Sequence, residues 1–527
     1  MKKSYLFSLF ALVCVACEWE SYNPDTYKVN EEPSGSNDKK FYTYYLEVIQ
    51  PETVPFGGCR DSLVIKSYKK SNKGDTVKVS WEVVKNDAFP SWLELGPKVE
   101  GKKIDRMPFT VQAQSAVVAK VYNYDLSTNG GNAARSTSNC YMVHSPGSYK
   151  LPLVYGNAIK DGVDNTEAYM PPGADGDTFL TPFRNHDDAG IASPWLKDNA
   201  VVPDNARLVW EDSKGLVTDI SINDDYLCFN VPDDAVEGNA VLAATMGGTV
   251  VWSWHIWITN STMEEGAQLK IGSNTYKVAS MNLGYATDGR RLNDIPGRQC
   301  VLTIRQSEDK GKQQIITLRQ SGKSSSSSDG YKFCTFYQWG RKDPFIPAAE
   351  SETGRVSRNA FNARGGKAMI MYAVPQGIGW TIQNPDIHVI NQSNRGPYGP
   401  YGSSQKNFWS ARSKTIYDPC PPGYRVMPYH VLSYMKEHGT IVRNEEEKGL
   451  IWSEGNNVVL FTATGFRDSS SGAVWQAGQN GWYWSADVEN DGYAKAIASS
   501  FSNVNVTALT ESHVYKTSGF AVMAIVE

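Results

Sequence analysis

The residue types that could perform chemistry do not form a known catalytic arrangement in this sequence. It contains no G-x-S-x-G nucleophile motif, no H-E-x-x-H metal motif and no glycine-rich dinucleotide fingerprint. Residues 487–492 begin like an EF-hand loop, but Ala498 stands where that loop needs a bidentate Glu. A looser calcium site there stays open, whereas the acidic runs 175–177 and 186–188 fit solvated loops. We expect no catalytic residue, no enzyme activity and no cofactor other than a calcium ion.

A loop rich in glycine and proline carries the best candidate binding residues. Tyr398 and Tyr401 lie among the glycines and prolines of residues 395–402, and Trp409 follows closely. Such a composition favours a loop over a strand. Aromatic side chains exposed on a loop can stack on sugars or anchor a partner protein. If the rings fold back instead, they cover the core of the domain. We predict Tyr398, Tyr401 and Trp409 as ligand-binding residues.

The first residues have the layout of a secretory signal peptide. Lys2 and Lys3 precede an apolar run, residues 5–16, that is too short to span a bilayer as a helix. The stretch 12–17 resembles the lipobox of bacterial lipoproteins, although Cys14 stands where those signals prefer Leu. That resemblance implies cleavage after residue 16 and a lipid on Cys17. The alternative is an ordinary secreted protein.

A polar tether follows the cysteine. Residues 17–40 are rich in Glu, Asn, Asp, Ser, Gly and Pro, a composition that stays flexible. Glu18 and Glu20 resemble the acidic export tag of surface lipoproteins of Bacteroidetes, or they are simply part of the tether. With a lipid on Cys17, we expect the protein at the outer membrane, facing the cell exterior.

Composition indicates an extracellular, β-rich protein. The chain has 527 residues, a formal net charge of −4, and 12% aromatic residues, among them 28 Tyr and 15 Trp. The absence of a basic excess argues against nucleic acid as a partner. A high Tyr and Trp load is common in β-sandwiches and in binding surfaces for carbohydrate or protein. The length fits three or so domains.

Residues 41–125 show the pattern of a β-sandwich. Val77, Val79, Trp81 and Val83 alternate with polar residues, which predicts one strand over 76–84 with a single buried face. Several such short segments without a convincing helix indicate an immunoglobulin-like sandwich. The Ser-Trp-Leu run that begins at Ser91 resembles BACON-type domains.

Residues 126–260 predict a second sandwich. Gly247 and Gly248 supply the turn of a hairpin over 240–259, because glycine readily takes positive φ. The returning strand reads Trp-Ser-Trp-His-Ile-Trp, and His255 within it fits a sheet histidine better than a ligand. Together with the Asn-Cys-Tyr…Pro-Gly-x-Tyr…Gly-Asn run of 139–157, this strand resembles fimbrillin-type surface lipoproteins of Bacteroidetes. The resemblance implies a stalk or adhesin module.

Residues 261–527 carry ordered motifs. They begin with Met-Asn-Leu-Gly at 281–284 and continue with Phe-Tyr-Gln-Trp-Gly-Arg-Lys-Asp-Pro-Phe at 336–345, Asp-Pro-Cys-Pro-Pro-Gly-Tyr at 418–424 and Tyr-Trp-Ser-Ala at 483–486. This order resembles the Fibrobacter-type major paralogous domain, which implies a C-type-lectin-like fold at the cell surface.

Local signals within 261–527 add detail. Pro428 and Gly439 bracket a short predicted helix. An insertion over 289–330 predicts a hairpin turned at 309–311 and followed by a serine-rich run.

The cysteines are too few and too scattered to form a disulfide framework. After Cys17 there are six, without any C-x-x-C pair that would suggest a zinc ribbon: Cys59, Cys140, Cys228, Cys300, Cys334 and Cys420. The resembled family ends in Val-Arg-Cys, where this chain has Val-Met-Ala at 522–524. If Cys420 lacks that usual partner, the resemblance makes Cys334 the replacement to test.

The sequence thus predicts a mainly β protein: two immunoglobulin-like sandwiches followed by a C-terminal α+β domain of C-type-lectin-like fold. We expect a lipid-anchored surface binding protein, either an adhesin or a pilus-associated tip or anchor protein. The alternative is a glycan-binding surface lipoprotein of a polysaccharide uptake system. Expected partners are the outer membrane, pilin subunits, and host or dietary glycans.

Overall fold

The fold is mainly β, with 49% of the described residues in strands and 6% in helices. The computed structural model describes residues 40–527 except 85–88, 115–118, 177, 265, 293, 296, 309–310, 324–331, 348–360, 365–369, 373–376, 391–404, 445–448, 456, 490–492 and 502–508. Within those described residues, no helix is long and apolar enough to cross a bilayer. Cys17 and the tether up to residue 39 lie outside them.

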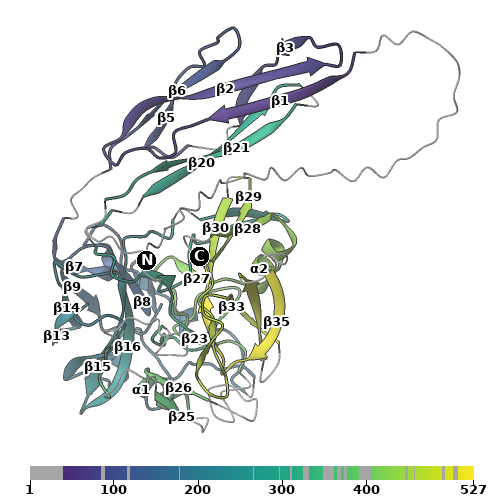
Figure 1. Cartoon of the computed structure of the whole chain (residues 1–527). Helices are drawn as coiled ribbons and strands as arrows, with labels where there is room; N and C mark the ends of the chain where they lie inside the picture. The colour runs from purple at the N-terminus through teal and green to yellow at the C-terminus, as the bar shows by residue number, and fades with distance from the viewer. Residues whose placement is uncertain are drawn as a thin grey trace, which may run out of the picture.

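Two sheets packed face to face form an N-terminal sandwich that stands apart from the rest of the chain (Figure 1). The first sheet has the order β1 (Tyr42–Ile49), β2 (Cys59–Ser71), β6 (Asp105–Val111) and β5 (Leu93–Leu95), with β3 (Thr76–Lys78) also on β2. The second has the order β21 (Gln313–Gln320), β20 (Arg298–Gln306) and β4 (Trp81–Val84). Their inner faces share one core, to which the first sheet gives Leu63, Ile65 and Phe109 and the second Trp81, Leu302, Ile304 and Leu318.

The hairpin β20–β21 corrects the expected domain boundaries. The sequence predicts it as an insertion within the C-terminal domain, over 289–330. The structure places it in the N-terminal sandwich instead, where β20 pairs with β4 and supplies most of the second sheet. Without it, the core side chains of β2 and β6 would face water. The first unit is therefore built from two segments that are distant in sequence.

The predicted strand over 76–84 is split between the two sheets. β3 pairs with β2, whereas β4 pairs with β20. Val79 lies between them and donates its backbone N–H to Ser67 O at 3.1 Å. The predicted buried face is confirmed at Val79 and Trp81, but Val77 on β3 is 42% exposed. The chain bends between β3 and β4 from one sheet into the other, and of these two strands only β4 contributes side chains to the sandwich core.

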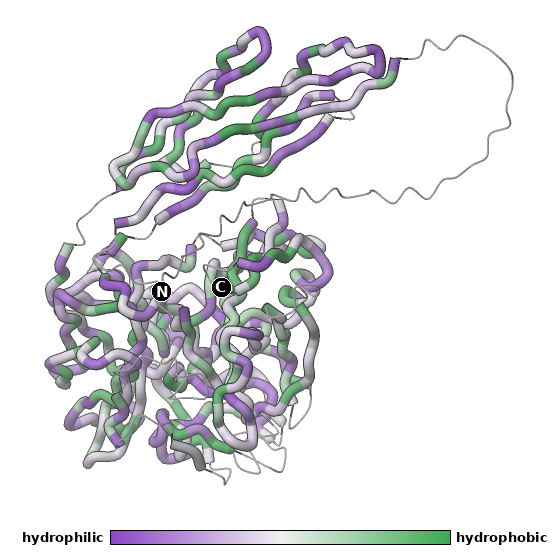
Figure 2. The backbone as a smooth tube through the Cα atoms, in the orientation of Figure 1, coloured by the Kyte–Doolittle hydropathy of each residue, from purple (hydrophilic) through white to green (hydrophobic). Residues whose placement is uncertain are grey.

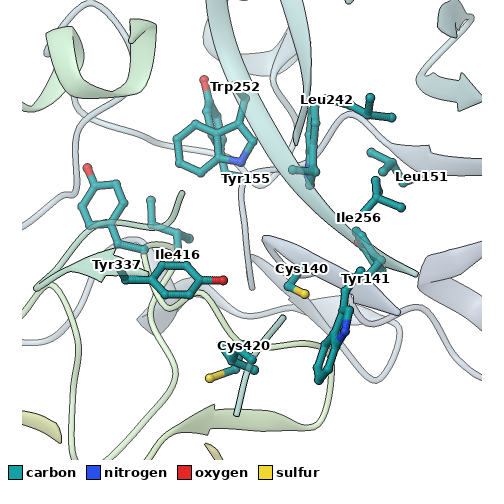
Figure 3. Packing of buried hydrophobic residues seen from close by; sticks show 14 of the residues in the cluster. Cys140, Tyr141, Leu151, Tyr155, Leu242, Trp252, Ile256, Tyr337, Ile416 and Cys420 are labelled. Atoms are coloured by element: carbon teal, nitrogen blue, oxygen red, sulfur yellow. The ribbon is translucent and has the colours of Figure 1, made fainter. Parts of the chain in front are cut away.

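The second and third predicted domains form one larger unit with a continuous core. The largest hydrophobic cluster runs from Cys140 to Ala524, and residues from 140–258 pack directly against residues 337–426 (Figure 3). The boundary at 125/126 is also wrong, since β7 (Val121–Asp125) pairs in parallel with β9 (Gly147–Pro152). Long-range packing, rather than sequence order, therefore defines this unit.

Two sheets make up one half of this unit. The first has the order β24 (Phe361–Asn362), β12 (Asn205–Glu211), β15 (Gly238–Met246), β16 (Thr249–Ile258) and β8 (Cys140–Val143). The second has the order β13 (Thr218–Asn223), β14 (Tyr226–Val231), β9 and β7. The predicted hairpin β15–β16 is confirmed, with φ of 56° and 83° at Gly247 and Gly248. Nearly every residue of both strands is buried, so β16 is covered on both faces.

The other half is built on an irregular sheet near the C-terminus. Its order is β32 (Val474–Trp475), β31 (Phe466–Arg467), β36 (Gly519–Val522), β33 (Asn480–Val488), β34 (Tyr493–Ser500) and β35 (Leu509–Tyr515), with β23 (Tyr337–Gln338) also on β36. A three-stranded sheet lies beside it, formed by β28 (Thr440–Asn444), β29 (Gly449–Glu454) and β30 (Asn457–Thr462). The predicted helix is α2 (Tyr429–Glu437), which begins after Pro428 and buries Val431, Leu432 and Met435.

Short elements connect these layers. The two-stranded pairs are β10 (Ile159–Lys160) with β11 (Val163–Asp164), β17 (Gln268–Ile271) with β18 (Asn274–Lys277), β19 (Ala286–Thr287) with β22 (Lys332–Phe333), β25 (Ile370–Tyr372) with β26 (Ile387–Val389), and β27 (Tyr424–Val426) with β37 (Ala524–Val526). The other α-helix is α1 (Ile378–Gln383). Hydrophobic and hydrophilic residues alternate along the strands of both units (Figure 2).

Candidate functional site

One of the three predicted ligand-binding residues belongs to the core. Trp409 is fully buried, and its Nε1–H donates to Tyr417 O at 3.0 Å. Its ring lies 5.7 Å from that of Trp339, centroid to centroid. The expectation that Trp409 binds ligand is therefore wrong, because the ring covers the core. Tyr398 and Tyr401 lie outside the described residues, and their role stays a prediction.

The proposed bond between Cys334 and Cys420 is not present. Both thiols are free and fully buried, and they belong to different core clusters. Cys334 Sγ lies 3.3 Å from Thr464 Oγ1, so a hydroxyl occupies the neighbouring position instead of a second sulfur. Burial raises the pKa of both thiols. These cysteines act as small core residues here.

The expected calcium site over residues 487–492 stays a prediction, because residues 490–492 lie outside the described part of the chain. Within the part that is described, no three His, Cys, Asp or Glu side chains gather as metal ligands would.

A relay of buried polar side chains crosses the core of the larger unit. Asn239 Nδ2 donates to Asp212 Oδ2 at 2.8 Å, and His255 Nε2 lies 2.9 Å from Asn239 Oδ1. Tyr337 Oη completes the chain, 3.2 Å from His255 Nδ1. Burial lowers the pKa of His255 to about 3 and raises the pKa of Asp212 to about 7. His255 is confirmed as a sheet histidine whose ring nitrogens both have partners.

A serine and a lysine also meet in the core. Lys342 Nζ donates to Ser253 Oγ at 2.6 Å and to Asp343 Oδ1 at 2.7 Å. Burial lowers the pKa of Lys342 to about 8, against the opposite pull of Asp343. Such a pair can activate a nucleophile, but Ser253 has no solvent-exposed surface. The contact therefore holds the 336–345 segment against β16.

The exposed side chain best placed to meet a ligand is Trp475. It lies on β32, is 51% exposed, and pairs with Phe466 of β31. A row of aromatic rings begins at Phe466: the centroids of Phe466 and Trp482 are 5.3 Å apart, and those of Trp482 and Phe520 are 5.1 Å apart. Hydrophobic residues on the surface are common singly, so the significance of Trp475 depends on what surrounds it.

The loop that carries Trp475, residues 474–482 and hereafter the Trp475 loop, is held in a fixed conformation. Gly478 N donates to Ala463 O at 2.6 Å, and Gly465 N donates to Asn480 O at 2.7 Å. Phe501 N donates to Gln479 O at 2.7 Å. Gln476 has φ of 59°, a left-handed conformation that costs a non-glycine residue energy and is enriched at ligand-binding sites.

The amide of Gln476 is oriented by its neighbours. Its Oε1 accepts from Asn480 Nδ2 at 2.7 Å and from Trp482 Nε1 at 3.4 Å. With the oxygen held on the protein side, the Nε2 donors are left for another molecule. Gln476 and Gln479 are both exposed. The loop therefore presents an indole face beside amide donors and acceptors, on a rigid backbone.

The sequence carried a weak signal for this loop. Residues 475–480 read Trp-Gln-Ala-Gly-Gln-Asn, in which amides and a glycine follow an aromatic residue. The same features occur in the loop around Tyr398, so composition does not distinguish a braced, exposed site from other loops. Exposure and bracing are properties of the folded chain.

No protein family model, no curated protein and no solved structure matches this chain. The functional argument therefore depends on the geometry of the described residues.

Proposed function

We propose that the chain is a cell-surface binding protein of the adhesin class that recognises a glycan through the Trp475 loop. The observation that carries this proposal is the combination of an exposed indole with pre-oriented amides. The flat C–H face of a sugar ring packs against an indole, and its hydroxyls exchange hydrogen bonds with amides. A rigid loop loses little conformational entropy on binding, which increases affinity.

The domain assignments belong to the same proposal. The two-sheet N-terminal unit is taken as an immunoglobulin-like sandwich, and the irregular sheets around α2 as a lectin-like fold. A lipid on Cys17 would hold both at the outer membrane, with pilin subunits as further partners. The sandwich would then act as a spacer between the membrane and the Trp475 loop.

A glycan array probed with the full chain tests the proposal. Trp475→Ala should weaken binding by about 2 kcal/mol or more, roughly thirtyfold, as expected for an aromatic anchor. Gln476→Gly should weaken binding without lowering the melting temperature, because glycine adopts positive φ freely. Tyr122→Ala is the matched control, since that ring is 74% exposed on the opposite half of the unit.

The outcomes separate the alternatives. Binding to one dietary polysaccharide would favour the uptake lipoprotein, whereas binding to host glycans or co-purification with pilins would favour the adhesin. Glycan binding that survives Trp475→Ala would refute the Trp475 loop as the recognition site.

A further inference from the structure

Three buried polar side chains near the centre of the C-terminal half have atoms without hydrogen-bond partners among the described residues. They are Nδ1 and Nε2 of His388, Nε of Arg467 and Oγ1 of Thr517. All three residues are at most 1% exposed. An unsatisfied buried polar atom destabilises the folded state, so several of them in one region require an explanation.

Two of the three side chains, His388 and Arg467, each lie against one of two phenylalanine rings, Phe345 and Phe336. The His388 ring packs edge-on against Phe345, with centroids 5.1 Å apart. The Arg467 guanidinium lies 5.6 Å from the Phe336 ring centroid. The backbones of Phe336 and Phe345 pair in an isolated antiparallel β-bridge.

Thr517 is tied to the same place. Gln338 Nε2 donates both to Thr517 O and to Val389 O, each at 2.7 Å. The Gln338 amide therefore binds both the backbone of Val389, next to His388, and the backbone of Thr517. Strands β26 and β31 and the turn before β36 converge here.

The charge at this position is positive. Arg467 Nη1 donates to Gly472 O at 3.0 Å and Nη2 to Ile346 O at 2.7 Å, and both acceptors are neutral carbonyls. The Arg341 guanidinium lies 5.0 Å from the Phe345 ring centroid. Burial, then the charges of Arg467 and Arg341, lowers the pKa of His388 well below its usual value, and the carboxylate of Asp468 opposes this only in part. A buried charge is costly unless a counter-charge or a full set of hydrogen bonds compensates it.

We infer that His388, Arg467 and Thr517 form an internal binding site for a small oxyanion. A water molecule could accept from Arg467 Nε, but it would not balance the charge. A metal cation would be repelled by the two guanidinium groups. An oxyanion would accept from Arg467 and Thr517, and it would favour the protonated form of His388, in which both ring nitrogens donate. The site adjoins the Trp475 loop, since Arg467 pairs with Val474, but the inference does not rest on the function proposed for that loop.

Thermal unfolding of the full chain in chloride buffer, with oxyanion added at constant ionic strength, tests the site. Inorganic phosphate, sulfate and acetate are the probes, so that inorganic oxyanions and carboxylates are distinguished. We expect a saturable rise in melting temperature with at least one of them. A salt effect that does not saturate, or that all three anions share equally, would overturn the inference.

Two variants locate the effect. His388→Leu should abolish the saturable rise while leaving the melting temperature in chloride equal or higher, because it removes unsatisfied atoms from an apolar environment. Arg467→Lys keeps the charge but loses the Nε donor, and it should raise the half-saturating concentration at least tenfold. If His388→Leu does not fold, Arg467→Lys alone tests the site. His430→Leu, an exposed histidine on α2, is the control.

A rise that persists in both variants would place the anion elsewhere and refute the site. A crystal structure grown with the stabilising anion that shows only water at His388 and Arg467 would refute it as well.

Discussion

Truncating one side chain of the β20–β21 hairpin should destabilise the N-terminal sandwich. This is expected although the hairpin comes after strands β7 to β16 of the larger unit in the sequence. Leu302 on β20 is 1% exposed and packs into the sandwich core, opposite Ile316 of β21. Replacing a buried Leu with Ala costs about 2–5 kcal/mol, from lost transfer free energy and the cavity left behind. A loss of about 3 kcal/mol of stability corresponds to roughly a hundredfold increase in the population of the locally unfolded sandwich.

Native-state hydrogen exchange read by mass spectrometry is the assay, because it resolves the stability of separate units. In Leu302→Ala, amides of β2 and β6 should exchange roughly a hundredfold faster, while those of β33 and β36 keep their wild-type rates. Ile315→Ala on β21 is the matched control, since Ile315 is 63% exposed and its truncation should change stability by about 0.5 kcal/mol or less. Faster exchange in β33 and β36 with no change in β2 and β6 would refute the assignment and return the hairpin to the C-terminal half.

Burial raises the pKa of Asp212 to about 7 in the folded state, so the folded chain holds this proton more tightly than the unfolded chain. The free energy of unfolding should fall as pH rises from about 4 to 7, by up to about 1.4 kcal/mol per unit. Asp212→Asn should flatten this dependence of the unfolding free energy on pH, as measured by denaturant titrations at several pH values. An unchanged dependence would show that Asp212 is not its cause. Cys334 and Cys420 should react with maleimide only after unfolding, whereas partly exposed Cys59 should react in the native protein; a disulfide in the intact mass would contradict this. Cys17→Ala should move the protein from the detergent phase to the aqueous phase, and unchanged partitioning would argue against the lipid.

Much of the local structure follows from the sequence. The alternating pattern around Trp81 predicts its burial, the paired glycines at 247–248 predict the turn between β15 and β16, and Pro428 predicts the start of α2. Each of these signals is local: periodicity reports a buried face, and glycine or proline reports backbone geometry.

The candidate site was not predictable in the same way. Trp409 and Trp475 are both tryptophans near glycines, yet one is fully buried and the other is 51% exposed. Their local sequences do not encode this difference, because burial depends on which distant segments pack over the loop. For Trp409 the distant contact is Trp339.

Local patterns in the sequence were enough to identify several strands, such as β16, and the faces of them that avoid water. Which strands pair depends on packing in three dimensions, because an apolar face can be covered by any complementary apolar face, whatever its distance along the chain. The N-terminal sandwich shows this most directly: the inner face of β2 is covered by a hairpin that begins more than two hundred residues later. The hydrophobic effect rewards buried area without regard to sequence separation, so domain limits drawn along the chain did not coincide with the units that fold together.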